Sequence, residues 1–113
     1  MLVVDLLTKL KDQPESVSFN EVIATIAEHY QYTPAAFKNG DTFNEAGTNE
    51  GSCKIFYFAQ LNALTQAQTL ACFGDYYRQD VLAHPTANDH ANIRQFILHG
   101  WSGIEFNSVA LSL

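Results

Sequence analysis

The stretch from Asn44 to Lys54 gathers the side chains of this chain that are best suited to chemistry. Its eleven residues include two glycines, two asparagines, two acids, two hydroxyls, a thiol and an amine. It leads directly into the most apolar run of the protein, Ile55 to Ala59. A polar, turn-forming loop that ends on a buried helix fixes backbone N–H groups and reactive side chains in one place.

Cys53 is a candidate nucleophile because it lies in the first turn of the predicted helix, next to a lysine. The N–H groups of a helix N-terminus and a neighbouring amine both favour the thiolate. A cysteine nucleophile also needs a base, which His84, His90 or His99 could supply. One hypothesis is therefore a small cysteine-dependent hydrolase that uses Cys53 and His90. Against it, Glu50 opposes a thiolate, and a cysteine that serves as a small buried apolar side chain is the commoner case.

A second hypothesis is a binding or interaction protein with a polar pocket. If the helix that follows the loop packs against the last helix, the polar residues of both segments face each other. Helix N-terminal N–H groups in such a pocket would hold an anion or a carboxylate, so the expected partner is a protein or a small anionic ligand. The alternative is that these groups only cap helices and bond to one another. The candidate binding residues are Glu45, Asn49, Ser52, Lys54, Asp89 and Arg94, together with His90.

A cluster near the C-terminus contains residue types that can bind a metal ion. His84, Asp89, His90 and His99 lie within sixteen residues. Zinc sites usually carry ligand pairs at i,i+3 or i,i+4 spacing, and this cluster has none of them among its histidines. The sequence therefore predicts no metal site and no cofactor.

Composition and charge narrow the class of protein. With 113 residues the chain is long enough for one domain, 1–113, and not for two. A net charge of −6 with only six scattered Lys and Arg residues argues against nucleic acid and against anionic membranes. No apolar run approaches the ~20 residues that span a bilayer. Two cysteines form no disulfide framework, which favours a reducing compartment.

The hydrophobic pattern predicts a mainly α fold, a compact bundle of about five helices around a buried central helix, 52–62. Capping-box patterns begin helices at Ser18 and Thr65. The helix after Thr65 is expected to continue to His84, with Gly74 in its middle in close contact with the central helix. The remaining helices are predicted over 2–12 and 90–99. Residues 32–37 and 103–106 are candidates for a two-stranded β pair, and 38–41 for a turn.

Several segments resemble the HopJ family of type III effectors. The resemblance covers essentially the whole chain. It implies an effector-like bacterial protein and assigns no catalytic residue. The segments that carry it are Phe37 to Gly40, Asn44 to Phe56, Cys72 to Arg78, Asp89 to Arg94 and Gly100 to Ile104.

The expected location is the bacterial cytoplasm, with export through a type III system as the alternative. The N-terminus has an acid at its fifth position and no basic region, unlike a secretory signal. Type III export signals tend to be polar and Ser-rich, whereas this N-terminus has the pattern of a core helix. A housekeeping role inside the bacterium is therefore at least as well supported as delivery into a host.

Overall fold

Helices make up most of the chain, and short antiparallel strands pair residues 31–44 with the C-terminal segment. The structure is a computed structural model that describes residues 1–113. The helical elements are α1 (Val3–Asp12), η1 (Pro14–Ser16), α2 (Phe19–His29), α3 (Glu50–Leu61), α4 (Gln66–Ala71), η2 (Tyr76–Val81), α5 (Ala91–His99) and η3 (Gly100–Gly103). The strands are β1 (Gln31–Tyr32), β2 (Phe37–Asn39), β3 (Thr42–Asn44), β4 (Ile104–Phe106) and β5 (Leu111–Ser112). The mainly α class is thus as predicted, with small sheets added.

The strands form two separate sheets. In the larger one β2 lies between β3 and β4, with Phe37 opposite Phe106 and Asn39 opposite Ile104. The predicted β pair therefore exists, but its first strand begins at Phe37 instead of spanning 32–37. Gly40 has a φ of 58°, which lets β2 turn back into β3. The pairing of β1 with β5 was not predicted.

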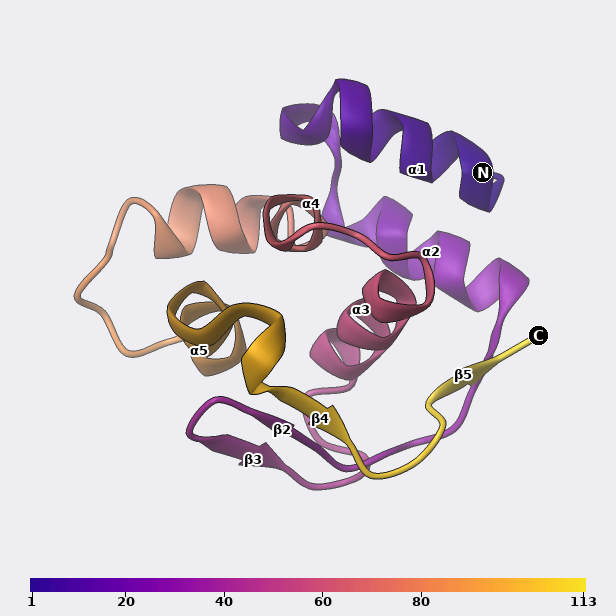
Figure 1. Cartoon of the computed structure of the whole chain (residues 1–113). Coiled ribbons are helices and arrows are strands. Elements are labelled where there is room, and N and C mark those ends of the chain that lie inside the picture. Colours follow the sequence, from indigo (N-terminus) through magenta and orange to yellow (C-terminus); the bar gives the residue numbers. More distant parts are fainter.

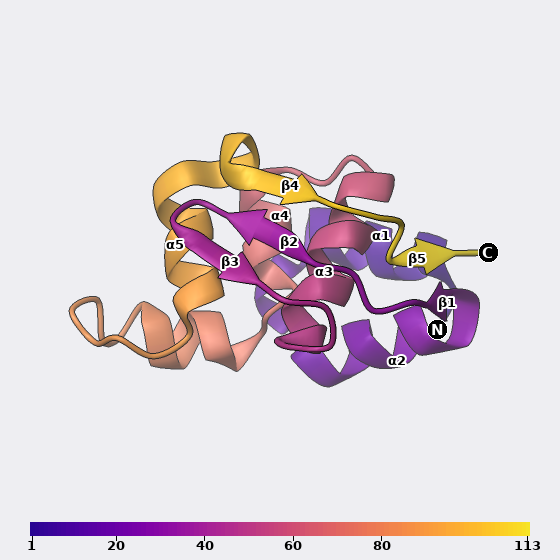
Figure 2. The same cartoon turned by 90° about the horizontal axis from the view of Figure 1, so that it is seen from below.

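The core fills the space between the helices and the larger sheet. Figures 1 and 2 show α3 between α2 and this sheet, with α5 over β2 and β3. Phe56 of α3 contacts Phe37, Phe73 and Phe96, at ring-centroid distances of 6.0, 5.4 and 5.0 Å. These rings come from a strand, a turn and α5, so one side chain ties three distant parts of the chain together. No helix is long and apolar enough to cross a membrane.

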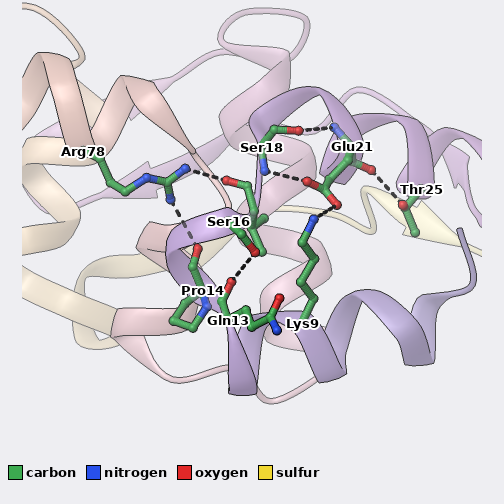
Figure 3. A network of polar contacts seen from close by, with 9 residues as sticks. Lys9, Gln13, Pro14, Ser16, Ser18, Glu21, Thr25 and Arg78 are labelled. Carbon is green, nitrogen blue, oxygen red and sulfur yellow. Dashed lines mark hydrogen bonds and ion pairs between the residues drawn. The ribbon is translucent and has the colours of Figure 1, made fainter.

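Both predicted capping boxes are present. The backbone N–H of Glu21 donates to Ser18 Oγ, at 3.2 Å, while the Ser18 N–H donates to Glu21 Oε2, at 2.8 Å. Lys9 of α1 adds an ion pair of 2.8 Å to Glu21, so the same carboxylate joins α1 to α2 (Figure 3). Burial alone would raise the pKa of Glu21, but the bonds from Lys9 and Ser18 outweigh it and lower that pKa. The second box joins Thr65 and Gln68 at the start of α4.

The prediction of one long helix from Thr65 to His84 is wrong. α4 ends at Ala71, a tight turn follows, and the π-helix η2 begins at Tyr76. Gly74 lies in the turn with a φ of 58°, not in mid-helix. A Cβ there would lie 2.7 Å from the backbone nitrogen of Phe19. The predicted close approach is therefore real, but it is made to the start of α2 and not to α3.

We expect Gly74→Ala to destabilise the fold far more than Gly47→Ala. Both glycines have positive φ, 58° and 85°, but a Cβ at Gly47 meets nothing within 4 Å. The left-handed conformation alone costs an alanine about 1–2 kcal/mol, which is the loss expected at Gly47. The added backbone clash should bring the loss at Gly74 to about 3–4 kcal/mol. Denaturant unfolding of both variants measures this difference, and equal losses would contradict the packing described for Gly74.

The buried thiol of Cys72 makes stability sensitive to alkaline pH. Burial raises its pKa to about 12, whereas an unfolded cysteine has a pKa of about 8.5. Above the lower value only the unfolded thiol ionises, so the free energy of unfolding falls as pH rises, by up to about 1.4 kcal/mol per pH unit. Denaturant titrations at pH 7 to 10 should give a shallower fall for Cys72→Ala than for the native chain. Val22→Ala, a buried control without a titrating group, should lower stability without changing the slope.

Candidate functional site

A hollow lined by polar and aromatic side chains lies where α3 and α5 begin. The pocket has a volume of about 440 Å³ and takes most of its polar lining from the two helix starts. Phe19, Phe73 and Tyr76 supply aromatic walls. The complete lining is Phe19, Thr42, Asn49, Gly51, Ser52, Phe73, Tyr76, His90, Ala91, Asn92 and Ile93. We call this cavity the α3–α5 pocket.

Both helices reach the pocket with free N–H groups. The backbone N–H groups of the first three residues of α3 and of α5 find no acceptor in the protein. Neither helix has a side-chain cap. This is unexpected for α3, because the residue before it is Asn49 and asparagine is among the best capping residues. Two helix dipoles therefore point their positive ends at one cavity.

The residues that would normally cap these helices are held elsewhere. Asn49, which precedes α3 in a left-handed conformation with φ 48°, donates its amide to Asn44 Oδ1 at 2.8 Å. His90 precedes α5 with φ 50°, and its Nε2 lies 2.9 Å from Asp80 Oδ2 of η2. Asp89 accepts from Arg94 Nη2 at 2.7 Å instead of capping α5. This bond holds the pKa of Asp89 below its usual value.

A buried network of asparagines beneath the pocket sets these positions. Asn92 of α5 donates to Asn44 Oδ1 at 2.9 Å, and Asn44 donates back to Asn92 Oδ1 at 3.1 Å. Asn39 Nδ2 donates to Asn92 Oδ1 at 3.0 Å and to the Asn92 carbonyl at 2.8 Å. With Asn49 attached to Asn44, the network fixes the starts of both helices to the β2–β3 hairpin.

The structure brings together three of the residues proposed from the sequence. Asn49, Ser52 and His90 all line the α3–α5 pocket. Sequence reasoning missed Thr42, Tyr76 and Asn92, because each lies outside the polar stretch or within an apolar pattern. The sequence contains one signal for this site, which is Asn92 in the first turn of α5. A helix that only packs on the core has no need of an asparagine there.

The other proposed binding residues lie away from this pocket. Glu45 is exposed in the loop, and its carbonyl accepts from Thr48. Lys54 Nζ lies 4.6 Å from the centre of the Tyr32 ring. Arg94 pairs with Asp89 and lines a different, apolar hollow. None of these three residues lines the α3–α5 pocket, so their role in binding stays a prediction.

Cys53 is not placed for nucleophilic catalysis. Its side chain is 1% exposed and lies outside the pocket, where Sγ donates to the Ala35 carbonyl at 3.6 Å. Burial raises the pKa of the thiol instead of lowering it. No hydrogen bond joins Cys53 to a histidine, and His90 is occupied by Asp80. The hydrolase hypothesis therefore finds no support in this geometry.

The histidines do not gather into a metal site. His84 is exposed in the loop after η2, and His99 lies at the far end of α5 from His90. His90 has two carboxylates nearby, Asp80 at 2.9 Å and Asp89 at 3.8 Å. No group of three or more His, Cys, Asp or Glu side chains is arranged to hold a metal ion.

Comparisons with known proteins agree with the resemblance seen in the sequence. The family model described as HopJ type III effector protein matches residues 3–111. The protein VPA0580, whose crystal structure is described as that of a protein of unknown function, is 52% identical in sequence to this chain. The two structures superpose with a TM-score of 0.98 over 99% of this chain and 93% of that one. No curated protein matches the chain. Because the family model spans nearly the whole sequence, this chain belongs to the HopJ type III effector family.

Proposed function

We propose that this protein is a binding protein whose α3–α5 pocket takes a small anionic ligand. The observation that carries the proposal is the convergence of two uncapped helix N-termini on one cavity. Orphan N–H groups at a helix start are well suited to phosphate, sulfate or carboxylate oxygens. Cavities of about 300–1,000 Å³ are typical of small-molecule sites, and this one has a volume of about 440 Å³.

The side chains around the cavity suit the same ligand. Asn49 and Ser52 add polar groups beside the free N–H groups of α3, and His90 lies at the start of α5. Four acids adjoin lining residues in sequence, and none of them is part of the lining: Asp41, Glu50, Asp75 and Asp89. Burial and Glu50 together raise the pKa of Tyr32, which lies outside the pocket. The net charge of −6 disfavours anions over most of the surface, so the helix starts would provide the local attraction.

The proposed place of action is the bacterial cytoplasm. The two cysteines are free and buried, as suits a reducing compartment. Export through a type III system is the alternative that the family description suggests. In either place the protein would act through what it binds and not through a reaction at Cys53.

Ala91→Asp should abolish anion binding without damaging the fold. Ala91 is the exposed first residue of α5 and lines the pocket, so a carboxylate there would repel an incoming anion. The same charge in the first turn of a helix stabilises it by about 0.3–1 kcal/mol. We expect inorganic phosphate to bind the native chain with a Kd on the order of 1 mM, about −4 kcal/mol. Amide shifts of Gly51, Ser52 and Ala91 in ¹H–¹⁵N spectra, recorded at constant ionic strength, measure this binding.

The matched control is Ala91→Asn, which adds nearly the same volume without the charge and should retain binding. Thermal unfolding of both variants would confirm that the fold is unchanged. Shifts that do not saturate, or that fall outside the pocket residues, would show that the native chain has no anion site here.

A further inference from the structure

Three aromatic side chains form a continuous wall beside the free N–H groups of the α3–α5 pocket. The Phe19 and Tyr76 ring centroids are 5.1 Å apart in an edge-to-face arrangement. The Tyr76 and His90 centroids are 5.3 Å apart, with an interplanar angle of 41°. The rings come from the start of α2, the start of η2 and the residue before α5. We call these three residues the aromatic shelf.

The shelf reaches the start of α3 because Gly51 has no side chain. A Cβ at Gly51 would lie 2.9 Å from Cζ of Phe19. The ring of Phe19 therefore rests directly against the first turn of α3, where the free N–H groups are. A ligand whose anionic group met those N–H groups would have an aromatic surface next to it.

Tyr76 is the exposed member of the shelf, and its element η2 is tied to the rest of the protein at two residues. Its side chain is 45% exposed, and no hydrogen bond within the protein uses its hydroxyl. It begins the π-helix η2, an element that is rare and often found at functional sites. Arg78 ties η2 to the carbonyls of Pro14 and Val17, at 3.3 and 2.6 Å, and Figure 3 shows it reaching Pro14. Asp80 ties η2 to His90.

We infer that the ligand of the α3–α5 pocket is an aromatic anion, a planar ring that carries a phosphate or carboxylate group. This inference rests on the proposed function and names its ligand class. The anionic group would accept from the N–H groups at the starts of α3 and α5. The ring would lie against Tyr76, because aromatic rings attract one another in stacked or edge-to-face arrangements beyond the burial of their area. An aliphatic anion of the same charge gains nothing from the shelf.

The test compares phenyl phosphate with methyl phosphate, which carry the same charge and the same ester linkage. Phenyl phosphate should bind the native chain about 5- to 10-fold more tightly. Its ring current should also move the Tyr76 ring protons upfield, which methyl phosphate cannot do. Tyr76→Leu keeps an apolar side chain but removes the flat ring, so it should bring the two affinities to within about 2-fold of each other. Tyr76→Phe is the matched control and should keep the preference.

The outcomes separate the inference from the function on which it rests. If the native chain binds neither ester nor inorganic phosphate, the proposed anion site is wrong. If it binds both esters equally, the site stands and the aromatic ligand class is wrong. A preference that survives in Tyr76→Leu would also overturn the role of the shelf. Should Tyr76→Leu fail to fold, the affinity ratio and the Tyr76 ring shifts of the native chain decide the matter.

Discussion

The arrangement of this protein depends on hydrogen bonds among buried asparagines. Asn39 and Asn44 of the hairpin are 0% and 1% exposed, and Asn92 of α5 is 5% exposed. A buried amide that loses its partner costs about 1–3 kcal/mol, so each member holds the others to one geometry. Leucine at these positions would lack the hydrogen bonds that fix the hairpin against α5. The main effect of the network is to fix the hairpin and α5 in one relative position, rather than to add to the free energy of unfolding.

That constraint explains why the helix starts remain open. An asparagine before a helix normally folds its side chain over the first turn, but Asn49 is recruited by Asn44 and adopts a left-handed backbone instead. His90 resembles Asn49 in this respect. Its ring is bonded to Asp80, and its backbone is also left-handed. Such conformations cost about 1–3 kcal/mol each and cluster at functional sites. The hairpin, η2 and both helices thus cooperate to leave donors uncapped at one cavity.

The sequence predicts the elements whose signals are local and fails where position depends on tertiary contacts. Ser18 with Glu21, and Thr65 with Gln68, mark their helices because the capping partners lie three residues apart. The break after Ala71 was missed because Gly74 turns only to make room for the backbone of Phe19, 55 residues earlier. Among the residues that line the pocket, Asn49, Ser52 and His90 come from the polar segments of the sequence, whereas Tyr76 and Asn92 are recognised only once η2 and the hairpin are in place.

Helical geometry places neighbouring residues of the stretch from Asn44 to Lys54 in different surroundings. Successive residues on an α-helix point about 100° apart, and here Ser52 and Cys53 have different surroundings. Ser52 lies in the lining of the α3–α5 pocket, while Cys53 turns into the core and donates to the Ala35 carbonyl. Lys54 continues the rotation toward Tyr32, on the side away from the cavity. The two neighbours therefore differ in role: the Ser52 side chain is at the cavity, whereas the Cys53 thiol packs in the core.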